Sequence, residues 1–122
     1  MLLIDANAIL RYILCDNAEM AENVEELLDN TIVTIRNEVL AEVVYVLEKV
    51  YKLPKDKIHS ALVQLLDMEN VSIDDKAVVL LALETFMQTK LDFVDTLLYA
   101  YHNLKGADIF TFDKGLTSKL NQ

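Results

Sequence analysis

Apolar residues follow two alternating patterns along this chain. In the first, short runs are mainly apolar or β-branched, which is typical of strands buried on both faces of a parallel sheet. In the second, longer segments repeat their apolar positions at helical spacing, as Val39, Val43 and Val46 do. The strand pattern occurs at residues 1–4, 31–35, 71–73 and 107–112. The helical pattern occupies residues 6–14, 18–29, 37–52, a segment that follows Pro54, and residues 74–89, 93–104 and 114–120.

This alternation predicts an α/β fold. Strands separated by single helices or helix pairs form a parallel sheet through right-handed crossovers, with helices packed on both faces. We therefore expect a short central parallel sheet of about four strands. A length of 122 residues, with 53% apolar and 25% charged side chains, indicates one globular domain over residues 1–122.

No segment has the composition of a membrane span or a signal peptide. Uncharged apolar runs stay well short of the ~20 residues that cross a bilayer, and Asp5 interrupts the first run with no basic residue before it. The single cysteine, Cys15, excludes an intramolecular disulfide and suits the reducing cytoplasm. Because Cys15 ends the apolar stretch 9–14, we expect a buried structural thiol.

Four acidic residues occupy positions that suit a cation-dependent site. Asp5 and Asp113 each follow a predicted strand, and ligands of open α/β folds bind outside the carboxyl edge of the sheet. Glu42 borders the apolar stripe of its helix, and Asp95 lies in the first turn of another. Two carboxylates 4 Å apart repel by about 4 kcal/mol at an effective dielectric near 20. Such a cluster persists only where cations or shared protons relieve the repulsion, so we expect a functional site.

Each strand-end aspartate has a structural alternative. Asp5 is a good helix cap, and Asn7 either orients a metal-bound water or a phosphate or serves as a cap itself. Asp113 also fits a simple turn before Lys114. Thr111 lies two residues before Asp113, on the same side of the predicted strand, where its hydroxyl can support the carboxylate or a metal-bound water.

The two helical acids have acidic neighbours one turn away. Glu38 precedes Glu42 by four residues, and we interpret it as a surface charge near a helix start. Asp92 precedes Asp95 by three residues; we expect Asp92 to cap the helix and Asp95 to face the cleft. Asp92 also remains a candidate for positioning a metal or its ligands.

The net charge of −9 narrows the functional classes. Nucleic-acid binders derive most of their affinity from basic residues that neutralise phosphates, so an acidic chain argues against a passive binding module. It is compatible with a nuclease whose acidic centre is neutralised by divalent metal, and with a protein that docks against a basic partner.

Taken in order, four motifs resemble those of the PIN-domain ribonucleases, especially the small VapC-like toxins of prokaryotic toxin–antitoxin pairs. The resemblance covers nearly the whole chain. The motifs are Leu3-Ile4-Asp5-Ala6-Asn7, Asn37-Glu38-Val39-Leu40-Ala41-Glu42-Val43-Val44-Tyr45-Val46-Leu47, Asp92-Phe93-Val94-Asp95-Thr96-Leu97-Leu98-Tyr99-Ala100 and Phe110-Thr111-Phe112-Asp113-Lys114.

The resemblance implies a three-layer α/β/α fold and hydrolysis of RNA by an acidic quartet around Mg²⁺ or Mn²⁺. The implied catalytic residues are Asp5, Glu42, Asp95 and Asp113. Metal binding is implied for Asp5, Asp95 and Asp113, with Asn7, Asp92 and Thr111 in positioning roles. A cognate antitoxin and a homodimer are the implied protein partners. Two departures are Ala6, where many relatives carry threonine, and the end of the sequence at Gln122, where many add a further strand.

Two other functional classes compete with a ribonuclease. A non-catalytic interaction module with the same fold is disfavoured because all four acids are present. A phosphatase or phosphotransferase with Asp5 as nucleophile is ranked lower still, because no second acid lies two residues after Asp5 to act as acid or base.

Overall fold

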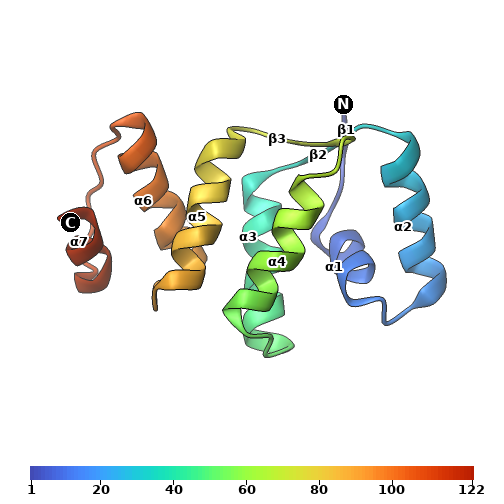
Figure 1. Cartoon of the computed structure of the whole chain (residues 1–122), viewed down its shortest axis with the longest axis horizontal. Coiled ribbons are helices and arrows are strands. Elements are labelled where there is room, and N and C mark those ends of the chain that lie inside the picture. Colours follow the sequence, from blue (N-terminus) through green and yellow to red (C-terminus); the bar gives the residue numbers. More distant parts are fainter. The chain divides into compact units, whose positions relative to one another are not determined.

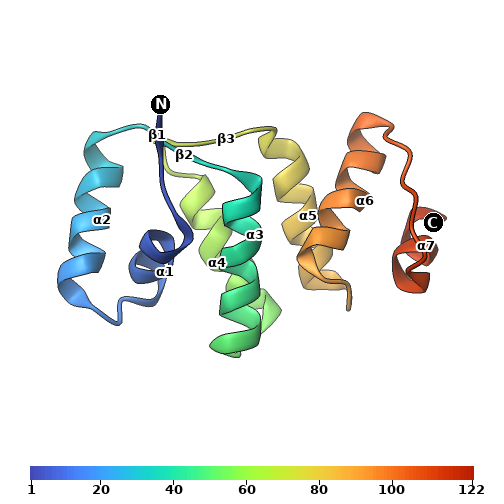
Figure 2. The ribbon, with the colours of Figure 1, turned by 180° about the vertical axis from the view of Figure 1, so that it is seen from behind.

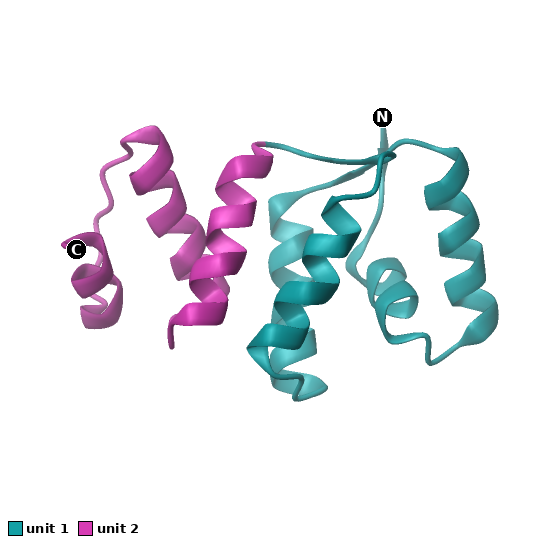
Figure 3. Cartoon of the chain, in the orientation of Figure 1, with its two compact units in different colours: residues 1–74 teal, residues 75–122 magenta.

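The chain is described over all 122 residues by a computed structural model, in which it forms two compact units. The first unit comprises Met1–Asp74 and the second Asp75–Gln122 (Figure 3). Each unit is described by itself below. No helix combines the length and the apolarity that a membrane crossing requires.

The first unit contains the sheet, which lies at one end of its helices (Figures 1 and 2). Three parallel strands, β1 (Leu2–Leu3), β2 (Val33–Ile35) and β3 (Val71–Ile73), are hydrogen-bonded in the order β1-β2-β3. Leu2 pairs with Val33, and Val33 pairs in turn with Val71. The α/β class with a short parallel sheet is therefore confirmed, and Val33 and Ile35 of β2 are buried in its centre.

Five helical segments complete the first unit. They are α1 (Ala6–Leu14), α2 (Ala18–Asn30), α3 (Asn37–Tyr45), the π-helical turn η1 (Val46–Val50) and α4 (Lys55–Leu66). Helix α1 packs against both α2 and α3, and α4 packs against β3 and η1. Fully buried aliphatic side chains form the centre of this packing, among them Ile9, Leu28, Leu40, Leu47 and Leu62.

All the regular secondary structure of the second unit is helical. It contains α5 (Lys76–Gln88), α6 (Phe93–Lys105) and α7 (Lys114–Leu120), with α6 in contact with both neighbours. Phe86 and Phe93 meet edge to face, with ring centroids 6.1 Å apart. Gly106 ends α6 in the left-handed conformation, at φ 70°, which is common at a helix stop.

The predicted fourth strand, residues 107–112, is wrong: the segment between α6 and α7 has no regular secondary structure. Its apolar and aromatic residues favour an extended chain, but a strand also needs a hydrogen-bonded neighbour. The backbone bonds here are local instead. The N–H of Ala107 donates to the Tyr101 carbonyl, at 3.4 Å, and the N–H of Asp113 donates to Thr111 Oγ1, at 3.0 Å.

The expectation of a buried Cys15 is also wrong, because its free thiol is exposed. Cys15 follows the last residue of α1 as its C-cap, in the left-handed conformation with φ 50°. The buried face of α1 is formed by Ala6, Ile9 and Leu10, one or more turns earlier. Cys15 therefore belongs to the turn that leaves the helix and not to the apolar face.

Candidate functional site

Asp113 is held in place by the start of helix α7. Its carboxylate Oδ2 accepts a hydrogen bond from the Leu116 N–H, at 2.7 Å, so Asp113 is the N-cap of that helix. Its carbonyl accepts a second bond from the Thr117 hydroxyl, also at 2.7 Å. Thr111 Oγ1 accepts from the Asp113 N–H. Thr111 thus supports the backbone of Asp113, whereas the sequence suggested the carboxylate or a metal-bound water. Oδ1 of Asp113 is not used by the cap.

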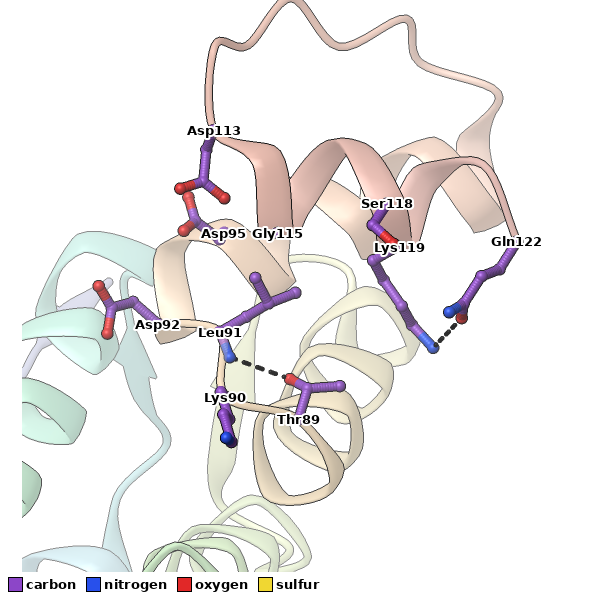
Figure 4. Close-up of a pocket in the computed structure, with 10 residues that line it drawn as sticks. All are labelled: Thr89, Lys90, Leu91, Asp92, Asp95, Asp113, Gly115, Ser118, Lys119 and Gln122. Carbon is purple, nitrogen blue, oxygen red and sulfur yellow. Dashed lines mark hydrogen bonds between the residues drawn. The ribbon is translucent and has the colours of Figure 1, made fainter.

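Asp95 lies in the first turn of α6, and its carboxylate faces that of Asp113 (Figure 4). Partial burial raises the pKa of Asp95 above its ordinary value, and the negative charges of Asp113 and then Asp92 raise it further. Burial and the two neighbouring negative charges all disfavour the ionised form of the Asp95 carboxyl group. The second unit therefore contains a pair of facing carboxylates whose repulsion a cation would relieve.

The two carboxylates line a hollow of about 430 Å³, all of whose lining residues belong to the second unit. Gly115 leaves room next to Asp113. A side-chain carbon at Gly115 would lie 3.4 Å from Asp113 Oδ2 and 3.3 Å from Leu91 Cδ2. The hollow is lined by Thr89, Lys90, Leu91, Asp92, Asp95, Asp113, Gly115, Ser118, Lys119 and Gln122 (Figure 4).

The sequence predicted that the side chain of Asp92 caps α6, and the structure differs on this point. It occupies the N-cap position, but its side chain makes no capping hydrogen bond. Figure 4 shows this side chain directed away from the facing carboxylates of Asp95 and Asp113. The carboxylate of Asp92 is exposed at the rim of the hollow, so a positioning role there stays a prediction.

Sequence reasoning missed the contribution of helix α7 to the hollow. Ser118 and Lys119 follow Gly115 by three and four residues, and this helical spacing places all three on one face. This spacing can be read from the sequence and would have indicated that the three residues share one face of α7. Lys119 Nζ lies 3.3 Å from Gln122 Oε1 and 5.0 Å from the centre of the Tyr99 ring, so α7 adds a second cation, besides Lys90, to the wall of the hollow.

Asp5 and Asn7 lie at the start of α1 in the first unit. Asp5 Oδ1 accepts a hydrogen bond from the Ala8 N–H, at 2.9 Å, which makes Asp5 the N-cap. Asn7 is inside the first turn and exposed, so its role as the cap is excluded. Like Asp113, Asp5 uses one carboxylate oxygen for a helix and leaves the other available. The capping and ligand interpretations are therefore compatible for both residues.

Glu42 and Glu38 are exposed on α3, one turn apart, but their environments differ. Glu38 Oε1 accepts a bond from Arg36 Nε, at 3.0 Å. The pKa of Glu38 is lowered first by a hydrogen bond from its own backbone and then by Arg36. Glu42 makes no ion pair or side-chain hydrogen bond. Its carboxylate is thus free to bind a ligand, whereas that of Glu38 has a partner.

The predicted quartet is divided between the two units. Asp5 and Glu42 belong to the first unit, on helices α1 and α3 that contact each other. Asp95 and Asp113 face each other in the second unit. No group of three or more acidic, histidine or cysteine side chains is arranged to hold a metal ion. The gathering of all four acids stays a prediction.

A comparison of the sequence with known protein families finds one match that includes residues of both compact units. The sequence model of the PIN domain matches residues 2–119, which is nearly the entire chain. The chain belongs to the PIN domain family. The match includes all four predicted acids and extends through both compact units. PIN domains are generally nucleases, and so hydrolases, that typically use divalent metals. No curated protein and no solved structure matches the chain.

The raised pKa of Asp95 predicts how the stability of this PIN domain depends on pH. A group whose pKa is higher in the folded protein contributes stability below its unfolded value, and this contribution is lost as pH rises through the folded value. We therefore expect Asp95 to lower the free energy of unfolding as pH rises from the ordinary aspartate value of 3.8. Thermal unfolding at several pH values should show a smaller loss over this range in Asp95→Asn. An identical pH profile in the variant and the wild type would contradict this expectation.

Proposed function

We propose that this PIN domain is a metal-dependent endoribonuclease with Asp5, Glu42, Asp95 and Asp113 as its acidic residues. The observation that carries the proposal is the facing pair of Asp95 and Asp113, in a chain whose family generally contains nucleases. A carboxylate whose ionisation is made costlier by a facing negative charge, as that of Asp95 is by Asp113, is a poor arrangement for stability alone. The facing pair becomes favourable when a divalent cation neutralises it.

The residues fit a hard divalent cation such as Mg²⁺ or Mn²⁺. Carboxylate oxygens are the ligands that such ions prefer, and the acids proposed to hold the ion are Asp5, Asp95 and Asp113. Asp5 and Asp113 each retain an oxygen beyond the one that caps a helix. A bound cation supplies Lewis-acid chemistry, which activates water at neutral pH and stabilises negative charge on the leaving oxygen of the RNA.

The other polar residues act by positioning. Glu42 has an unpartnered carboxylate and is proposed to complete the site or orient the attacking water. Thr111 fixes the backbone that carries Asp113. Asn7 and Asp92 are exposed beside proposed ligands, where each can orient a water molecule or a phosphate oxygen.

We further propose that the protein is the toxin of a toxin–antitoxin pair and acts in the cytoplasm as a homodimer. The sequence motifs shared with small VapC-like toxins support this assignment. The net charge of −9 gives physical support to a basic antitoxin partner. Such a partner would suppress the nuclease until it is removed.

Metal dependence tests the proposed reaction directly. The purified protein should cleave RNA when Mg²⁺ or Mn²⁺ is present and should lose cleavage when EDTA removes the ion, because the acids repel phosphate without it. Cleavage of a labelled RNA is followed on a gel, with a DNA strand of the same sequence as the control. Full activity in EDTA would overturn the metal-dependent mechanism.

Binding of Mn²⁺ tests whether the acids of the two units form one site. Calorimetry should show that Asp5→Asn and Asp113→Asn each weaken Mn²⁺ binding by a similar factor, because asparagine can still cap a helix but supplies a weaker ligand. If only Asp113→Asn weakens binding, the ion is held within the second unit. Absence of both Mn²⁺ binding and cleavage would favour a non-catalytic interaction module.

A further inference from the structure

The guanidinium group of Arg11 connects helix α1 to two other segments of the first unit. Its Nη1 donates a hydrogen bond to Oδ2 of Asp16, at 2.6 Å, in the turn that leaves α1. Its Nη2 donates to the hydroxyl of Tyr51, at 3.3 Å, and Tyr51 is the residue that ends the π-helical turn η1. Because all three residues belong to the first unit, these contacts describe that unit alone.

Arg11 is more deeply covered than the other ion-paired cations of the chain. Its side chain is 20% exposed, against 47% or more for the other cations in ion pairs. Its Nε atom is buried without a hydrogen-bond partner. A buried donor without an acceptor opposes stability, and apolar residues often stabilise a fold as well as a covered ion pair does. The two bonds of Arg11 are therefore better explained by the relative position of the segments that they connect.

Arg11 connects the two elements that carry the acids of the first unit named in the proposed site. Asp5 caps the start of α1, six residues before Arg11. Glu42 lies on α3, and α3 continues directly into η1 and so to Tyr51. Helices α1 and α3 contact each other, and the buried residues of both are all apolar. Apolar packing is non-directional, so the bond between Arg11 and Tyr51 adds a fixed point that packing alone does not supply.

We propose that Arg11 and Tyr51 are positioning residues, whose hydrogen bond holds α1 and α3 in the relative position that the proposed nuclease site requires. The inference rests on the proposed function and adds two residues outside its acids. Asp5 lies about 9 Å from Arg11 along α1, at about 1.5 Å per residue, so a small rotation of the helix displaces its carboxylate relative to Glu42. A displacement of about 1 Å can cost about 100-fold in rate even when the mutation that causes it is remote.

Tyr51→Phe tests the proposal by removing a single hydroxyl group. It should lower kcat for Mg²⁺-dependent RNA cleavage at least about tenfold, because the acids are less well aligned, and leave KM and the melting temperature nearly unchanged. The matched control is Tyr45→Phe, which removes a hydroxyl without a hydrogen-bond partner from the last residue of α3 and should cleave at the parent rate.

Arg11→Lys tests whether the two residues act through one bond. Lysine keeps the charge but lacks the planar fork that reaches two partners, so the variant should lose at least as much kcat as Tyr51→Phe. The double variant should be no slower than Arg11→Lys alone, because the bond is already lost. Losses that multiply in the double variant would overturn the proposal.

The distance between the two helices tests the proposal without metal or RNA. Spin labels are attached to Asn7→Cys on α1 and Glu38→Cys on α3, after Cys15→Ser removes the native thiol. Double electron–electron resonance should give a narrow distance distribution in this labelled parent. Tyr51→Phe should broaden the distribution, and Tyr45→Phe should leave it unchanged.

The outcomes separate this inference from the proposed function. An unchanged distance distribution in Tyr51→Phe, or a lowered melting temperature with kcat at the parent value, would overturn the inference and leave Arg11 with a structural role only. A broadened distribution in a protein that shows no Mg²⁺-dependent cleavage would retain the role of Arg11 and Tyr51 in holding α1 and α3, and would overturn the nuclease assignment alone.

Discussion

Replacing Asp95 by asparagine should abolish RNA cleavage while leaving the PIN domain folded and slightly more stable. The carboxylate of Asp95 faces that of Asp113, and asparagine keeps the shape while removing one negative charge. The proposed ion would lose a charged ligand, and removal of a metal-binding or charge-stabilising group costs at least about 100-fold in rate. Initial rates on a labelled RNA with saturating Mg²⁺ provide the measurement.

The stability of this variant supplies an independent readout. Without metal, the melting temperature of Asp95→Asn should rise by a few degrees at neutral pH, because repulsion from Asp113 is relieved. Added Mn²⁺ should stabilise the wild type more than the variant. Asp108→Asn is the matched control, since Asp108 is an exposed acid of the same unit outside the hollow. A variant that unfolds would show that Asp95 has a structural role, and one that cleaves RNA at the wild-type rate would remove Asp95 from the proposed site.

Helix boundaries were predictable because local chemistry determines them. The sequence predicted helices over residues 93–104 and 114–120; α6 ends one residue later, at Lys105, and α7 has the predicted bounds. A cap side chain, or a glycine in the left-handed conformation, acts within one turn of its own position. At the start of α2, the side chain of Asn17 acts in this way and accepts a hydrogen bond from the Met20 N–H.

The fourth strand was not predictable in the same way. Apolar, β-branched and aromatic residues over 107–112 establish that an extended conformation is favourable, but the hydrogen-bonded neighbour is a property of the whole fold. The π-helical turn η1 was missed for a related reason. Its apolar periodicity continues that of α3, so the sequence indicated one unbroken helix over residues 37–52.

For the candidate site, the sequence predicted the residue types better than their contacts. It identified Asp95 as facing a cleft, and the structure places its carboxylate at the hollow together with that of Asp113. It also treated capping and ligand binding as alternatives for Asp5 and Asp113. Both residues cap helices with one oxygen only, so capping leaves the other oxygen for the proposed ligand role. Spacing along a chain cannot reveal which oxygen of a carboxylate is used.

The pair of Glu42 and Glu38 provides the sharpest test of the proposed site, because these residues lie one turn apart on α3 and carry the same functional group. Glu42→Gln should lower the rate of RNA cleavage at least about 100-fold, the scale expected when a group that orients a metal or its water is lost. The carboxylate of Glu42 has no protein partner, so its replacement should leave the melting temperature almost unchanged.

Glu38→Gln is the matched control and should change cleavage by less than about threefold, because Glu38 pairs with Arg36 at the solvent-exposed start of the helix. Its lowered pKa reflects a hydrogen bond from its own backbone and the guanidinium of Arg36, both of which are local to this turn. A crystal soaked in Mn²⁺ should show anomalous density near Glu42 and none near Glu38. The reverse pattern, in cleavage and in density, would keep the nuclease assignment but move the site one helical turn toward the start of α3.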